Sequence, residues 1–65
     1  MKKPTFAARL RTLREAAGLS IPDLAAKCSM PRQTVHRLER SERAPSWETV
    51  QRLAKALGVR PNDFE

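Results

Sequence analysis

The segment from Ser20 to Leu38 constrains the fold more than any other part of this 65-residue sequence. It reads as two short helices joined by a tight turn, and the second of these helices has two distinct faces. Val35 and Leu38 lie three residues apart and share its apolar face. Its other face collects polar side chains at helical spacing: Arg32, Gln33, His36, Arg37 and Arg40. The segment therefore predicts a helix that is packed along one side and exposed along the other.

The exposed face of that helix carries side chains that can read DNA. Arginine can bind guanine through two hydrogen bonds, and glutamine can pair with the major-groove edge of adenine. The formal net charge of +6, from 13 Lys and Arg against 7 Asp and Glu, also favours a polyanionic partner. No apolar run approaches the roughly 20 residues that a membrane span needs. Double-stranded DNA is therefore the expected partner, and no membrane contact is expected.

Start and stop signals divide the chain into five helical segments. Three of the segments follow residues that can cap a helix: Thr5, Ser20 (with Asp23 as its capping-box partner) and Ser46. Gly18 and Gly58 can close the first and fourth helices in a left-handed conformation. The predicted helices cover residues 6 to about 17, 21 to about 28, 31 to about 40, 47 to 57, and a short turn at 61 to 64.

Apolar residues recur at helical spacing and predict one small core. Its members would be Phe6, Leu10, Leu13, Leu24, Val35, Leu38, Val50, Leu53 and Leu57, and Ala17 continues the stripe of the first helix. Trp47, at the first turn of the fourth helix, could pack in the core or against another subunit, and we favour the core. Because the sequence shows no β-alternation, repeat or linker, it predicts an all-α fold. We expect a compact five-helix bundle in a single domain over residues 1–65, with ragged ends at 1–4 and 65.

The sequence predicts neither a catalytic site nor a cofactor. It has one His, one Cys and no Gly-rich phosphate loop, and no pair of carboxylates is placed to converge. Cys28 falls on the inward face of its helix, opposite His36, so we do not expect the two to share a metal ion. A lone cysteine, with no apolar leader after the basic start at Met1–Pro4, is typical of the cytoplasm.

With its helices placed, the chain resembles the phage-repressor-like (Cro/XRE) helix-turn-helix family of DNA-binding proteins. The residues that carry the resemblance are Gly18-Leu19-Ser20, Leu24-Ala25-Ala26-Lys27, Thr34 to Arg40, Pro45-Ser46, Glu48-Thr49 and Leu53 to Val59. The resemblance implies a lambda-repressor-like domain with the helix-turn-helix at about 20–40 and its third helix in the major groove. The implied function is sequence-specific DNA binding by a small prokaryotic or phage transcriptional regulator.

The resemblance also implies roles for individual residues. The residues that read bases would be Arg32, Gln33 and Arg37, with His36 either joining them or remaining exposed and idle. Phosphates would be bound by Ser20, Arg14, Arg40 and Arg43. Arg14 and Glu39 would form an ion pair that joins the first helix to the third, and we expect Glu39→Ala to destabilise the fold more than Arg14→Met.

Three positions depart from the family pattern. Ile21 stands where the family often has a glutamine that reaches a phosphate, so only the backbone N–H and the helix dipole remain for that contact. Ser29 stands in the turn, where the family favours a left-handed glycine, at a cost on the order of 1 kcal/mol. Ser41 replaces a residue that is often Gly or Asn. None of these changes is expected to break the fold.

Two questions stay open at the level of sequence. The same fold can serve as a protein-interaction module or an antitoxin-type subunit, and the arginines would then form a solvated surface. The family usually binds a palindromic operator as a symmetric dimer. We expect a monomer or a weak homodimer that pairs on DNA. The predicted contact surface lies near the C-terminus: Val59, Pro61, Phe64 and the nearby Trp47.

Overall fold

The computed structural model describes residues 5–64, which form four α-helices and one short 3-10 helix. The elements are α1 (Phe6–Ala16), α2 (Ile21–Cys28), α3 (Arg32–Glu39), α4 (Trp47–Leu57) and η1 (Pro61–Phe64). No strand occurs within these residues, so the all-α prediction is confirmed. The fifth predicted helix is a 3-10 turn, and a count of five α-helices is therefore not confirmed. The predicted ragged ends at 1–4 and 65 lie outside the described residues.

Three of the four α-helices begin at a hydroxyl side chain that caps the first turn. The hydroxyl oxygens of Thr5, Ser20 and Ser46 accept hydrogen bonds from backbone amides three residues later, at 3.1, 3.2 and 3.1 Å. Asp23 completes a capping box, because its carboxylate accepts from the backbone amide of Ser20 at 3.3 Å. Helix α3 differs, since it follows Pro31 and has no side-chain cap.

Left-handed residues turn the chain on both sides of α3. Ser29, with φ of 56°, closes α2, and Ser41, with φ of 59°, follows α3. Ser29 thus occupies the left-handed turn position where the family favours glycine, and that conformation strains a residue that has a Cβ. The chain therefore turns once before α3 and once after it.

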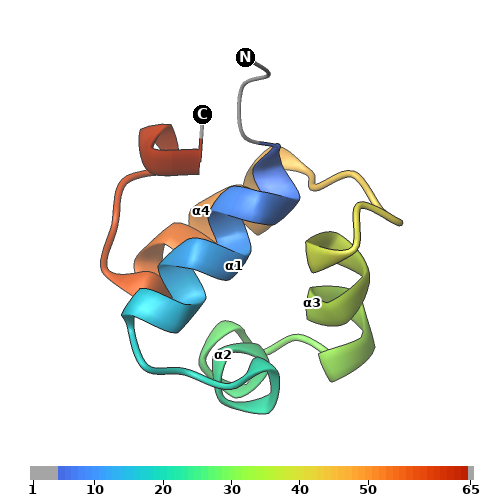
Figure 1. Cartoon of the computed structure of the whole chain (residues 1–65), viewed down its shortest axis with the longest axis horizontal. Coiled ribbons are helices and arrows are strands. Elements are labelled where there is room, and N and C mark those ends of the chain that lie inside the picture. The colour runs from blue at the N-terminus through green and yellow to red at the C-terminus, as the bar shows by residue number, and fades with distance from the viewer. Residues whose placement is uncertain (1–4, 65) are drawn as a thin grey trace.

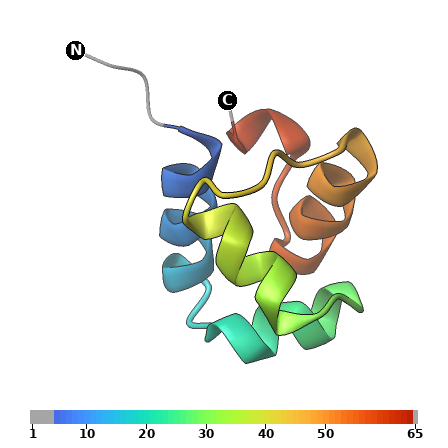
Figure 2. The same cartoon turned by 90° about the vertical axis from the view of Figure 1, so that its right-hand side faces the viewer.

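Helix α3 packs against α1 and α2, while α2 also contacts α4 and η1 bridges α1 and α4. Figure 1 shows α3 at one side of the molecule, with α2 below α1 and α4. Figure 2 looks at α3 directly and shows α1 and α4 on either side of it, so its outer face is uncovered. No helix within residues 5–64 is both long enough and apolar enough to cross a membrane.

The core lies where the apolar faces of the four α-helices meet. Five of the nine predicted core residues are fully buried: Leu10, Leu24, Val35, Leu38 and Leu53. The other four are half-buried and pack against these: Phe6, Leu13, Val50 and Leu57. Small residues complete the core: Ala25 of α2 and Ala54 of α4 are both buried, and these two helices are in contact.

Three predicted placements are wrong. Trp47 is 63% exposed, because it lies in the first turn of α4 and is not part of the core cluster. Ala17 is exposed, because α1 ends one residue earlier and Ala17 is its C-cap. Phe64 is buried, and its ring centroid lies 5.1 Å from that of Phe6. It therefore packs within its own chain and is not free for a subunit contact.

Candidate nucleic-acid interface

The outer face of α3 presents the four predicted base-reading residues. Arg32, Gln33, His36 and Arg37 are all exposed, while Val35 and Leu38 anchor the opposite side of the helix. Three of the four line a shallow hollow of about 310 Å³ together with a residue of α2; its lining is Ile21, Arg32, Gln33 and His36. We call it the reading hollow. Arg37 lies outside it.

A second hollow adjoins the first and is rich in arginine. It measures about 250 Å³ and is lined by Arg11, Arg14, Ile21, His36, Glu39 and Arg40. We call it the arginine hollow. Ile21 and His36 border both hollows, so the two form one continuous surface. Arg11 was not identified from the sequence, because only the packing of α1 beside α3 brings it to this place.

Arg14 and Glu39 form an ion pair with two hydrogen bonds between α1 and α3. Arg14 Nε lies 2.6 Å from Glu39 Oε2, and Arg14 Nη2 lies 3.0 Å from Oε1. A third donor, Nη1, reaches the backbone carbonyl of Leu19 at 2.9 Å. The hydrogen bonds to Glu39 raise the pKa of Arg14, so this side chain stays charged. With three of its five N–H donors engaged inside the protein, Arg14 has at most two left for a phosphate.

The remaining predicted phosphate ligands lie in three different settings. Arg40 lines the arginine hollow and pairs loosely with Glu42 at 3.3 Å, with both side chains largely exposed. Ser20 is exposed, but its amide and its hydroxyl oxygen already serve the capping box. Arg43 lies away from both hollows, in the loop between α3 and α4. The structure therefore brings Arg14 and Arg40 together, but not Arg43.

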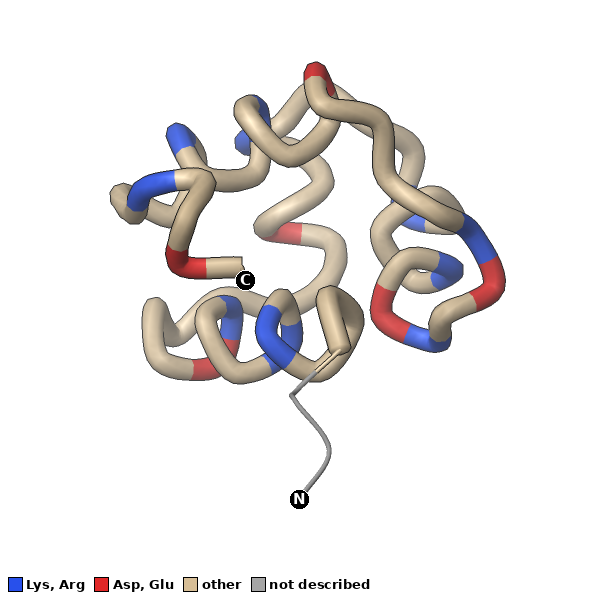
Figure 3. Tube along the Cα trace, turned by 90° about the horizontal axis from the view of Figure 1, so that it is seen from above, with Lys and Arg blue, Asp and Glu red and all other residues tan. Residues whose placement is uncertain are grey.

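The arginines of the reading face, like most cations within residues 5–64, have no carboxylate partner; the ion pairs there involve Arg11, Arg14, Arg40 and Arg52. Lys and Arg are spread over several elements, as Figure 3 shows, so charge alone does not single out one face. Four acidic residues within 5–64 are held in ion pairs: Glu15, Glu39, Glu42 and Glu48. Asp23 and Asp63 instead accept hydrogen bonds from backbone amides. Among the described residues, neither Arg32 nor Arg37 forms an ion pair, so both guanidinium groups are available to an outside acceptor.

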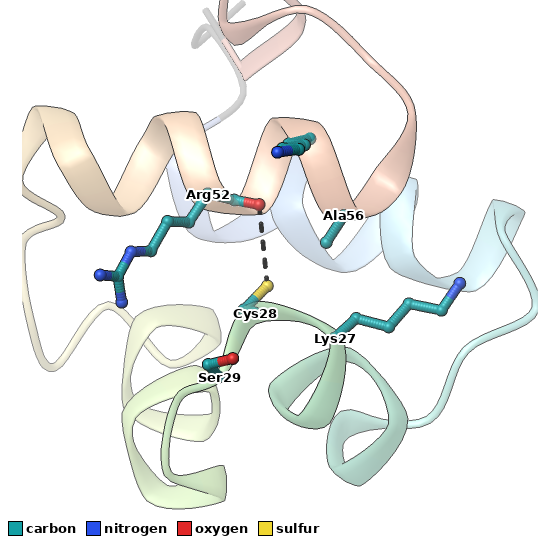
Figure 4. Close-up of a pocket in the computed structure, with 6 residues that line it drawn as sticks. Lys27, Cys28, Ser29, Arg52 and Ala56 are labelled. Atoms are coloured by element: carbon teal, nitrogen blue, oxygen red, sulfur yellow. Dashed lines mark hydrogen bonds between the residues drawn. The ribbon is translucent and has the colours of Figure 1, made fainter.

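A separate hollow of about 530 Å³ lies between α2 and α4, and Figure 4 shows it. Three cations line it, namely Lys27, Arg52 and Lys55. The thiol of Cys28 points toward the backbone carbonyl of Arg52, with sulfur and oxygen 3.9 Å apart. Burial raises the pKa of this thiol, so it stays protonated near neutral pH despite the nearby Arg52. No cluster of three potential metal ligands occurs within residues 5–64.

Comparison with known proteins matches this arrangement to a family. A family model described as a helix-turn-helix domain covers residues 5–65. The chain belongs to this helix-turn-helix family. An uncharacterized HTH-type transcriptional regulator of Mycobacterium tuberculosis is 34% identical over 64 residues, which are 98% of this chain and 25% of that protein. Control protein C.BamHI of Bacillus amyloliquefaciens is 32% identical, with 91% of this chain matching 74% of its length.

A solved structure gives the same result at the level of fold. The restriction-modification controller protein C.AhdI from Aeromonas hydrophila superimposes with a TM-score of 0.90 and 38% sequence identity. The match covers 92% of this chain and 91% of that one. The chain thus spans about a quarter of the mycobacterial regulator but nearly all of the controller protein. The family resemblance seen in the sequence is confirmed.

Proposed function

We propose that this helix-turn-helix chain is a sequence-specific DNA-binding regulator of transcription that reads the major groove with α3. The observation that carries the proposal is the exposed face of α3, where Arg32, Gln33 and Arg37 stand together and neither arginine forms an ion pair within residues 5–64. Unpaired guanidinium groups beside Gln33 can form the two-bonded contacts that distinguish guanine and adenine. The transcriptional regulators and controller proteins among its relatives support the same function.

In this proposal, base reading and phosphate binding fall to different residues. Arg32, Gln33 and Arg37 contact base edges, and His36 lies beside them at the rim of the reading hollow. Arg40 and Arg11 bind phosphates at the arginine hollow, where Arg14 contributes its remaining donors. Ser20 and Arg43 contribute weaker contacts to the DNA backbone. Affinity then comes mainly from the phosphates, and sequence preference comes from α3.

We further propose that the chain works in the cytoplasm as one helix-turn-helix unit over residues 1–65, without catalytic activity or a cofactor. A single reading helix covers about half of an operator. Two copies that form a weak homodimer on a palindromic operator would place their α3 helices roughly 34 Å apart. With Phe64 buried, the contact surface falls to the half-buried Val59 and Pro61 and to the exposed Trp47.

Selection of bound duplexes from a random library at low salt tests the function directly. We expect salt-sensitive binding with enrichment of one motif. Arg32→Ala and Arg37→Ala should each weaken binding to that motif by roughly 1–3 kcal/mol, about 5- to 150-fold, and relax the preference at one base pair. Arg40→Ala should weaken binding to all sequences alike and flatten the salt dependence.

Lys55→Ala is the matched control, since it removes an exposed cation that lines the hollow between α2 and α4 rather than the reading face. It should leave the selected motif unchanged. Retention of no duplex, or retention without sequence enrichment, would contradict the proposal. That outcome would favour the alternative, a protein-interaction module or antitoxin-type subunit.

A further inference from the structure

Ile21 is an apolar residue that packs against the core on one side and reaches the proposed DNA-binding surface on the other. It is the first residue of α2 and is only half-buried, in contrast to the core residue Leu24 one turn further on. It borders both the reading hollow and the arginine hollow. The capping box at the start of α2 is formed by Ser20 and Asp23, so Ile21 is not needed for that purpose. Its exposed part therefore forms an apolar wall beside the residues proposed to read bases.

The combination of that wall with hydrogen-bond donors matches one base edge in particular. In the reading hollow, Ile21 stands beside the donors of Arg32 and Gln33. Among the four base edges in the major groove, only that of thymine carries a methyl group, and its O4 acceptor lies next to that group. A guanine, adenine or cytosine edge has no methyl group to place against this apolar wall.

The neighbouring arginine hollow provides cations that the phosphates of a DNA strand could contact. Its exposed cations, Arg11 and Arg40, line this second hollow, and Ile21 and His36 belong to both hollows. A strand whose phosphates contact these arginines would bring its base edges toward Ile21. The side chain therefore stands between the part of the surface suited to the DNA backbone and the part suited to the bases.

We propose that Ile21 is a specificity-determining residue whose side chain receives the C5-methyl group of one thymine in each half-site. This inference rests on the proposed DNA-binding function and adds a base preference to it. Binding would remove the exposed part of Ile21 and the thymine methyl group from water together, which favours association. Loss of that methyl group should then weaken binding about three- to five-fold, as expected for one buried methyl-sized group.

Deoxyuridine scanning of the selected operator tests this inference. Deoxyuridine keeps the hydrogen-bonding edge of thymine and lacks only its C5-methyl group. Replacing thymines one at a time should weaken binding of the wild-type protein about three- to five-fold at one position per half-site, and leave binding unchanged at thymines outside the reach of α2 and α3. Ile21→Ala should bind thymine and deoxyuridine equally at that position, whereas Ile21→Val should keep most of the difference.

The outcomes separate this inference from the function on which it rests. Selective binding with no deoxyuridine effect at any position would overturn the role of Ile21 and leave the proposed function intact. The same holds if Ile21→Ala keeps the full deoxyuridine penalty, or if the selected half-site contains no thymine. Absence of selective binding to any duplex would overturn both. The wild-type scan can overturn the inference even if Ile21→Ala folds poorly.

Discussion

Helices α2 and α3 each have eight residues, yet they are held in opposite ways. Helix α2 begins with a reciprocal capping box and buries Leu24, Ala25 and Cys28. Helix α3 begins after a proline, has no side-chain cap, and buries only Val35 and Leu38. Because its first backbone amides lack a side-chain partner and its polar face is uncovered, α3 depends on its neighbours for its position. The comparison shows that α2 helps to support the fold, whereas α3 presents an exposed polar surface.

The core contacts and the ion pair that hold α3 lie between its fourth and eighth residues. Val35 and Leu38 enter the core there, and Glu39 is paired to Arg14 of α1. The first turn, with Arg32 and Gln33, is left exposed. Such an arrangement fixes the direction of the helix while leaving its first turn free to meet a ligand. The predictions below test this division, from the largest expected effect to the smallest.

Leu38→Ala should have the largest effect, because it removes one of the two buried anchors of α3. Leu38 is 1% exposed, and we expect a loss of roughly 2–5 kcal/mol in the free energy of unfolding, measured by urea denaturation. The control is His36→Ala on the exposed face of the same helix, which should change stability by no more than about 0.5 kcal/mol. If both variants were equally stable, the anchoring assigned to α3 would be wrong.

Arg14→Met tests the second anchor. Glu39 has a side chain that is 6% exposed and hydrogen-bonds only to Arg14 among the described residues, so its carboxylate would be stranded. We expect Arg14→Met to lower the free energy of unfolding by roughly 2–4 kcal/mol, because an uncompensated buried charge is costly. Glu39→Ala should cost less, since Arg14 keeps its hydrogen bond to the carbonyl of Leu19. From the structure we therefore expect the opposite order to the one that the sequence led us to expect.

The pair Arg14→Met and Glu39→Ala, each made alone and then combined, forms a double-mutant cycle for this contact. The double variant should be more stable than Arg14→Met alone, because no charge remains buried without a partner. If the two single variants lost equal amounts of unfolding free energy, the hydrogen bond from Arg14 to the carbonyl of Leu19 would not compensate for the loss of Glu39.

Local signals in the sequence were sufficient for most of the fold. The caps at Thr5, Ser20 and Ser46 and the left-handed Gly18 and Gly58 depend on neighbouring residues, and each was predicted correctly. The fully buried core residues also followed from helical periodicity. These features were accessible because their physical causes act within one or two turns of helix.

What the sequence missed depends on contacts between distant segments. Trp47 has the spacing of a core residue, but no element within residues 5–64 packs over the first turn of α4 to bury it. Phe64 is buried because η1 returns to α1 and stacks it near Phe6, which no local pattern records. Arg11 joined the candidate site, and the side chain of Ile21 was seen to border both hollows, only when α1, α2 and α3 were placed together.

The smallest predicted effect concerns the capping box that distinguishes α2 from α3. Hydrogen bonds with Ser20 lower the pKa of Asp23. Because the folded-state pKa lies below that of the unfolded chain, ionised Asp23 stabilises the fold above about pH 4, and this contribution is lost as the pH falls through the lowered pKa. The stability advantage of wild type over Asp23→Asn should therefore be present at pH 7 and shrink below about pH 4.

Ser20→Ala provides the control for that pH dependence and the last test of the difference between α2 and α3. It removes the main cause of the lowered pKa of Asp23, so the decline in stability below about pH 4 should become shallower than in wild type. At neutral pH the lost cap should cost about 1 kcal/mol. Pro31→Ser, which offers α3 a cap it lacks, should not reproduce the pH dependence, because no carboxylate stands three residues later. Identical pH profiles for wild type and Ser20→Ala would mean that the capping box does not set α2 apart.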